Sequence, residues 1–514
     1  MRVYGTDPAL PNFARPEYRD VLPDLKLIAD QLGGTRAMHA ASKQYIRQWG
    51  AEQDEHYNIR RKCEEYFGGY ARTLSAAVGM LYAKAPGVEW NQSEAVLSPM
   101  WDNIDGAGNN GDVFLKRFSD AAIRDGLAIL LTDHPGRPVD PETGERVQLD
   151  GGNEDQFNLR PKWAMYGRAQ AINWLDEVVD NQRALTLLVL HERAAVPDGR
   201  YGIKQVNRYR ELRLIDAPDG RQAGWVLWEQ VDDAGDKPEH FKVVGSGTFR
   251  NRRGEAARLI PVGIAYTGRT DGIMQASIPL LAVAEANLGH WRLSTDLRFN
   301  TLVAAFAQPV WTGQLAADET GRRNGYEVGP LVGVHMEAGG TFGWEEPAGT
   351  GLERLALLVL EKLRQIAAQG VSFLATDTRA AETAEAKRLD ASAENATLAT
   401  AATGIEDAAN LGTEHLAWFL GVEKKDAPVI TLSRDFESTT MSSDVMTAYV
   451  RGIKDAGLPA RILLSAWQSG GRIGQDEDLD EIEMEMLMGR VADEDAEAED
   501  RAADEEGVTE DAAA

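Results

Sequence analysis

The clearest alternation of apolar and polar positions lies between residues 350 and 370. Thr350 and Glu353 have the spacing of a capping box, in which two side chains bind backbone amides at a helix start. Apolar residues then recur at steps of three and four, at Leu352, Leu355, Ala356, Val359, Leu363, Ile366 and Ala367. Gly370 is expected to end the helix in the left-handed conformation. The pattern therefore predicts an amphipathic helix over 350–369.

A longer, alanine-rich helix is predicted after a polar loop. Residues 371–379 are too polar and too broken for a helix, whereas residues 380–420 favour one. One side of this helix carries mostly small or isolated apolar residues, at Leu389, Ala393, Thr397, Ala401, Ile405, Ala408 and Leu411. Small residues permit close approach by a neighbouring element. Two interpretations stay open: a helical hairpin in an ordinary core, and a helix that packs against an adjacent copy.

The first part of the chain is predicted to be mainly helical. Residues 17–85 favour two or three helices, the last over 57–83 and closed by Pro86. The apolar stripe of that last helix is formed by Phe67, Tyr70, Leu74, Ala77, Val78 and Leu81. A helix over 112–125 then leads into a buried strand at 127–131.

Over residues 160–266 the sequence pattern changes to short runs of residues that favour β-strands. Turn residues such as those at 217–220 separate the runs, which predicts an antiparallel β region rather than a βαβ series. Gly245-Ser246-Gly247 and the arginine-rich stretch 250–258 are both interpreted as turns. A helix over 278–305 and a turn-rich insertion over 306–349 follow. The predicted fold class is α+β.

The negative charge is concentrated at one end of the chain. Residues 476–514 hold 18 acidic residues against two arginines, a net −16 of the total −27, so the other residues carry only −11. The last part, from about residue 490, lacks large apolar side chains and is predicted to be disordered. An acidic chain is unsuited to tight, sequence-specific binding of nucleic acid, which needs clustered cations.

The sequence contains few motifs that are typical of catalytic or metal-binding sites. It contains no phosphate loop, no His-Glu-x-x-His pair and no Gly-x-Ser-x-Gly elbow, and its eight histidines are scattered. Asp476, Asp478 and Asp480 resemble the opening of a calcium loop, but Glu481 replaces the required glycine and Leu487 the bidentate carboxylate. We therefore predict no catalytic residue, no metal and no cofactor. A metal-dependent nuclease built from distant carboxylates stays open.

The single cysteine, Cys63, excludes an intrachain disulfide and fits a reducing compartment. The N-terminus lacks an apolar signal region, and no uncharged run reaches the roughly 18 residues of a membrane span. We expect a soluble protein made in a cytoplasm, with roughly two to four domains.

Several passages together resemble one family. They are the helix with Arg60, Phe67, Thr73 and Gly79 that leaves through Lys84-Ala85-Pro86, the run 125–135 that ends Asp-His-Pro, and residues 160–174. These passages, and the order of the predicted parts, resemble phage portal proteins, specifically the group catalogued as the domain of unknown function DUF4055.

The resemblance implies a portal-like α+β fold. Its parts would be a β-rich wing at 1–276, a stem helix at 277–305, a clip at 306–349, a second stem helix at 350–369, a tunnel loop at 370–381, a long helix returning to the wing at 382–434, a helical crown at 435–489 and an acidic tail at 490–514. It also implies a homo-oligomeric ring, usually of twelve subunits, at one capsid vertex of the virion, assembled in the host cytoplasm. The implied partners are the terminase large subunit, a head-tail adaptor, the major capsid or scaffold protein, and double-stranded DNA that passes non-specifically; no membrane is involved.

The candidate contacts follow from that resemblance. Those of the channel and tunnel loop are Lys362, Arg364, Ser372, Phe373, Leu374, Thr376, Asp377 and Arg379; those of the clip, for terminase or adaptor, are Asp318, Glu319, Arg322 and Arg323. A mildly acidic body would retain DNA weakly because few counterions are displaced. Alternatively, Lys362 and Arg364 form surface ion pairs with Glu353, Glu361 or Asp377. A tail or scaffold component is the alternative structural role.

Overall fold

The computed structural model describes residues 4–134, 159–179, 181–218, 220–231, 237–305, 308–312, 339–345, 349–370, 384–434, 461, 464–465 and 477–484. The chain divides into two compact units, Met1–Arg434 and Asp435–Ala514. Helices and sheets both contribute, so the fold class is α+β, as predicted. In the second unit, Arg461 forms an ion pair with Asp480 at 2.7 Å, and Leu464 is buried. Most of the predicted crown and acidic tail lies outside the described residues.

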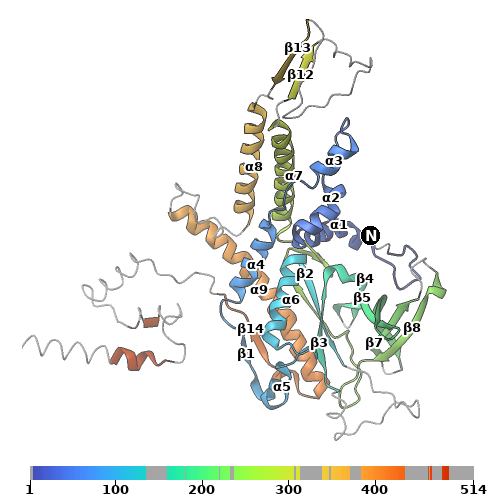
Figure 1. Cartoon of the computed structure of the whole chain (residues 1–514). Coiled ribbons are helices and arrows are strands. Elements are labelled where there is room, and N and C mark those ends of the chain that lie inside the picture. The colour runs from blue at the N-terminus through green and yellow to red at the C-terminus, as the bar shows by residue number, and fades with distance from the viewer. Residues whose placement is uncertain are drawn as a thin grey trace, which may run out of the picture. The chain divides into compact units, whose positions relative to one another are not determined.

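Figure 1 labels most of the helices and strands of the first unit. The helices are α1 Pro16–Leu32, α2 Gly34–Tyr45, α3 Asp54–Arg60, α4 Gly69–Leu81, α5 Glu94–Trp101, α6 Gly111–Asp125, α7 Leu281–Ala304, α8 Thr350–Gln369 and α9 Ala384–Leu420. The strands are β1 Gly87–Glu89, β2 Leu127–Asp133, β3 Lys162–Gly167, β4 Ala171–Val179, β5 Gln182–Asp198, β6 Gly202–Ala217, β7 Gly220–Gln230, β8 Phe241–Thr248, β9 Val262–Tyr266, β10 Thr270–Gly272, β11 Gln275–Ala276, β12 Gln308–Thr312, β13 Thr341–Glu345 and β14 Val429–Thr431.

The β region is antiparallel, as predicted. β4 to β8 form a five-stranded sheet in chain order, and a second sheet has the order β3-β2-β9. The pairs β1-β14, β10-β11 and β12-β13 are separate two-stranded sheets. Strands that follow one another in the chain are neighbours in the large sheet, which is an arrangement that antiparallel pairing allows.

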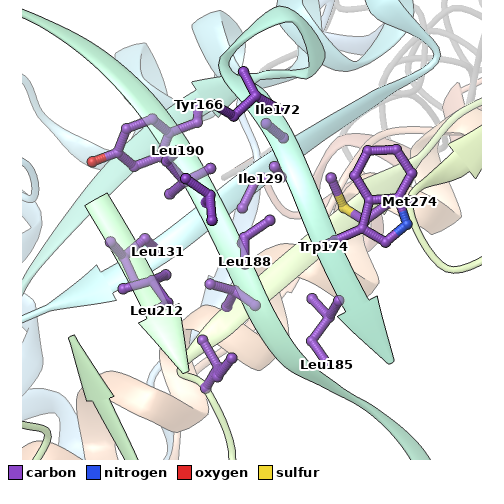
Figure 2. Close-up of a cluster of buried hydrophobic side chains, with 14 of the residues drawn as sticks. Ile129, Leu131, Tyr166, Ile172, Trp174, Leu185, Leu188, Leu190, Leu212 and Met274 are labelled. Atoms are coloured by element: carbon purple, nitrogen blue, oxygen red, sulfur yellow. The ribbon is translucent and has the colours of Figure 1, made fainter. Parts of the chain in front are cut away.

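β2 is buried on both faces because it lies between the large sheet and α9. Ile129 and Leu131 join a core cluster with Leu188 and Leu212 of the large sheet, and Figure 2 shows these side chains together. On the opposite face, the Thr132 hydroxyl donates to the Gly412 carbonyl oxygen of α9 at 3.4 Å. A strand covered on both sides reads as a continuous apolar run, which is why the sequence identified it.

A polar network also joins the two sheets. The Arg210 guanidinium of β6 binds Glu192 of β5 at 2.7 Å and Asp133 of β2 at 3.1 Å. The Tyr166 hydroxyl of β3 donates to the same Glu192 carboxylate at 2.6 Å, and burial raises the pKa of this tyrosine. Because the charges are paired and hydrogen-bonded, the network can sit close to the apolar core without leaving an isolated buried ion.

Two predictions about local structure outside α8 are wrong. Residues 57–83 form two helices, α3 and α4, because the chain between them bonds elsewhere: the Tyr66 amide donates to the Thr35 hydroxyl at 3.1 Å, and the Tyr66 ring packs on Trp291 of α7. The stripe predicted for that helix is buried except for Phe67. Gly245-Ser246-Gly247 lies in β8 and not in a turn, because the Trp225 ring of β7 lies over both glycines, where a Cβ would be crowded.

α9 packs very closely against β9 of the three-stranded sheet. A Cβ on Gly404 would overlap the Tyr266 carbonyl oxygen of β9, and a Cβ on Gly263 of β9 would overlap the Ala408 carbonyl oxygen. The small residues of α9 that are buried here include Ala401, Ala402, Ala408 and Ala409. Of the two interpretations left open for this helix, the structure supports packing inside one chain over residues 398–420.

Candidate functional site

α7 and α8 lie side by side, and the β12-β13 ribbon lies between them in the chain (Figure 1). Their contact is close at Gly289 of α7, where an added Cβ would lie 3.3 Å from Cε of Lys362. α7 confirms the helix that the sequence predicts over 278–305, and α8 confirms the amphipathic helix predicted over 350–369.

The ends of α8 differ from their prediction. The N-cap is Gly349, whose carbonyl oxygen accepts from the Glu353 amide at 3.1 Å, and no side chain caps the helix. Thr350 is thus inside the first turn, so the predicted capping box is wrong. Gly370 ends the helix in an extended conformation, at φ −80° and ψ 177°, and not in the left-handed one. Glycine fits there because a Cβ would lie 2.8 Å from the Ile366 carbonyl oxygen.

The apolar stripe predicted for α8 is confirmed, but it covers only part of the apolar surface of the helix. All seven stripe residues are half-buried or buried. Residues 355–360 are apolar without interruption, however, and Leu357, Leu358 and Leu360 keep 66%, 45% and 51% of their surface exposed. On α7, Leu302 and Val303 are exposed to 41% and 45%. Apolar side chains on a surface helix usually form one stripe that faces a neighbour. The described residues cover such a stripe on α8, and these three leucines lie outside it.

The side of α7 that carries Asp296 contacts α3, one of the N-terminal helices. Arg60 at the end of α3 is 1% exposed, and its guanidinium binds Glu52 at 2.7 Å and Asp296 of α7 at 2.7 Å. It also donates to the Arg47 carbonyl oxygen at 2.8 Å and lies 4.0 Å from the centre of the Trp49 ring. Its hydrogen bonds hold the pKa of Glu52 below the usual value. This cluster fixes α7 to the body of the first unit.

The two predicted channel cations on α8 have different surroundings. The Lys362 ammonium donates to Gln365 on its own helix at 2.8 Å and is half-buried beside Gly289. Arg364 is exposed. Among the described residues, neither cation forms the ion pair with Glu353 or Glu361 that the alternative interpretation requires; Asp377 lies outside them.

The other predicted contacts lie outside the described residues. This applies to the loop residues Ser372, Phe373, Leu374, Thr376, Asp377 and Arg379 and to the clip residues Asp318, Glu319, Arg322 and Arg323. Of the predicted clip, the structure describes the β12-β13 ribbon, in which Trp311 pairs with Phe342 and Pro309 with Trp344.

Within the described part of the chain, no group of three or more His, Cys, Asp or Glu side chains is placed to hold a metal ion. His415 of α9 is one of the scattered histidines, and burial lowers its pKa to about 4.

No helix in the described ranges has the length and apolar character needed to cross a bilayer.

Sequence reasoning missed two features of this region. The exposed leucines of α8 had a visible signal, the six consecutive apolar residues at 355–360, but only the half facing α7 was assigned. The Arg60 cluster had no local signal, because Arg60 and Asp296 are 236 positions apart in the chain.

The comparisons with known proteins point to the same region. Residues 279–420, which run from the start of α7 to the end of α9, match the family described as a domain of unknown function, DUF4055. That description names no function. No curated protein matches the chain.

Three solved structures align with the chain at low similarity. A chain of the "Virion of native gene transfer agent (GTA) particle" is 11% identical, with 83% of this chain and 97% of that chain covered and a TM-score of 0.35. A chain of the "Neck of empty GTA particle computed with C6 symmetry" is 11% identical, with 81% and 95% covered and a TM-score of 0.35. A chain of the "Neck of native GTA particle computed with C12 symmetry" is 10% identical, with 85% and 95% covered and a TM-score of 0.30. At these TM-scores the likeness carries no structural argument.

Proposed function

We propose that this protein is a virion structural protein of the portal type. Copies of the chain would close into a ring of about twelve around an axis, as cyclic homo-oligomers do. The ring would sit at one capsid vertex and pass double-stranded DNA during packaging and ejection. Terminase and a head-tail adaptor would dock on it in turn, and capsid or scaffold protein would surround it.

The observation that carries this proposal is the uncovered apolar side of α8. Leu357, Leu358 and Leu360 are about half exposed, and covering the exposed half of a leucine contributes roughly 1 kcal/mol. Three leucines would thus contribute roughly 3 kcal/mol per contact. A closed ring has as many interfaces as chains, so each interface would cover one such set of leucines. Self-assembly through α8 would therefore cover a surface that the described residues of one chain leave exposed.

The charge balance supports passage of DNA rather than retention. Apart from residues 476–514, the chain carries a net −11, so it displaces few phosphate counterions. We propose that Arg364, Lys362 and the loop residues Ser372, Phe373, Leu374, Thr376, Asp377 and Arg379 contact DNA or a neighbouring copy. Docking of terminase or adaptor is proposed for Asp318, Glu319, Arg322 and Arg323.

The double variant Leu357→Glu with Leu360→Glu tests the proposed contact. We expect self-association to weaken at least tenfold, because two carboxylates would have to leave water in every contact. Sedimentation velocity over a range of protein concentrations measures the association, and circular dichroism checks that the helices remain.

Leu259→Glu is the matched control for this variant. Leu259 is also exposed, to 47%, but it lies outside α7 and α8, so the same chemical change should leave association as it is in the parent. An assembly of the double variant that matches the parent in size and affinity would contradict the proposed contact.

A further inference from the structure

The hairpin of β5 and β6 extends beyond the rest of the large sheet. β5 pairs with β6 as far as Asp198 and Gly202. The pairing of β4 with β5 ends at Ala171 and Leu190, and the pairing of β6 with β7 begins at Arg208 and Glu229. Residues 193–207, here called the arm, are therefore a two-stranded ribbon. Among the described residues, no third strand pairs with it.

The base of the arm is fixed, whereas its end is open to solvent. At the base, Nδ2 of the Asn207 side chain donates to Oε1 of Gln230 on β7 at 3.1 Å, and Oδ1 of Asn207 lies 3.1 Å from Nε2 of His191. At the end, Tyr201 and Ile203 are exposed to 87% and 72%. A two-stranded ribbon is marginally stable in water by itself, so an arm of this length gains from being covered.

The arm differs in charge from the rest of the chain. It carries three cations, Arg193, Arg200 and Lys204, against one acid, Asp198, a net +2 within a chain of net −27. All four side chains are exposed, and no ion pair involves any of them among the described residues. The Arg200 guanidinium lies 5.2 Å from the centre of the Tyr201 ring, so cation and aromatic ring form one amphipathic end.

We propose that the arm docks on a second copy of this chain, with Tyr201 and Ile203 as its apolar contacts and its three cations against the acidic surface of that copy. The charge complementarity decides between partners: the arm is basic, and a second copy offers net −27. Complementary charges raise the association rate and favour one partner over others. This inference rests on the proposed self-assembly and adds a second contact to that of α8.

The variant Arg200→Glu with Lys204→Glu tests the inference by changing the arm from +2 to −2. Self-association measured by sedimentation velocity should weaken at least tenfold. Raising the salt concentration should weaken association of the parent but not that of the variant, because the variant replaces the attraction with a repulsion that salt also screens. Tyr201→Ser, which removes the ring and keeps the charge, should also weaken association, by a smaller factor.

The control is Lys237→Glu with Arg269→Glu, two exposed cations outside the arm, with 67% and 82% of their side chains accessible. It changes the net charge by the same amount, so it should associate much more tightly than the arm variant. An arm variant that assembles like the parent, or one that is weakened no more than this control, overturns the inference and leaves the proposed ring standing. A parent chain that does not self-associate overturns both.

Discussion

Replacing Arg60 by alanine should lower the free energy of unfolding by about 3–5 kcal/mol, the usual cost of removing one partner of a buried ion pair. Arg60 is 1% exposed, and its guanidinium binds Glu52 and Asp296 at 2.7 Å each. Without it, two carboxylates stay close together at a poorly hydrated position. Urea unfolding followed by circular dichroism measures the change.

Arg60→Lys separates the geometry of this cluster from its charge. Lysine keeps the positive charge but has no planar fork, so it cannot bind Glu52, Asp296 and the Arg47 carbonyl oxygen together. We expect a loss between those of the parent and the alanine variant. Arg269→Ala, at an exposed arginine, should change stability by less than about 0.5 kcal/mol. An Arg60→Ala chain as stable as Arg269→Ala would contradict the assigned role.

Replacing Gly404 by alanine should destabilise the first unit by about 2 kcal/mol, the upper end of the cost of overpacking less the gain in helix propensity. Alanine is the better helix former by about 1 kcal/mol, so propensity alone predicts the opposite sign. The new methyl group would overlap the Tyr266 carbonyl oxygen, however, and α9 would have to move away from β9. Adding a group to a tightly packed contact costs about 1–3 kcal/mol, and here the obstacle is backbone that cannot rotate aside.

Gly79→Ala is the matched control for that prediction. Gly79 is also inside a helix, α4, but it is exposed, and a Cβ there would meet nothing within 4 Å. This change should stabilise the protein by about 0.5–1 kcal/mol. Thermal unfolding of both variants measures whether each change stabilises or destabilises the protein. A stabilising Gly404→Ala would show that α9 does not approach β9 as described.

Periodic patterns of apolar residues predicted the helices and strands in which a regular set of positions is buried. The apolar stripe of α8 and the apolar run of β2 each show which residues of the element are buried against its neighbours. The type and the position of both elements could therefore be predicted from the sequence. Predictions from single residues were less successful. Gly349 and not Thr350 caps α8, and the chain around Tyr66 leaves the helix because Thr35 and Trp291 bind it.

The contacts that position the candidate site could not be predicted, because they join distant parts of the chain. Arg60 and Asp296 are one such pair, and Gly404 and Tyr266, whose backbones approach too closely for a Cβ between them, are another. The exposed leucines of α8 are different. Their run is visible in the sequence, but only the structure separates the leucines that α7 covers from those it leaves in solvent.

We propose that copies of this chain close into a ring around an axial channel. Electron microscopy of the purified protein at micromolar concentration tests this proposal through two-dimensional class averages viewed along the axis. We expect closed rings with a central opening wide enough for duplex DNA. Particles that are only monomers, or assemblies without such an opening, as a tail or scaffold component would form, would contradict it.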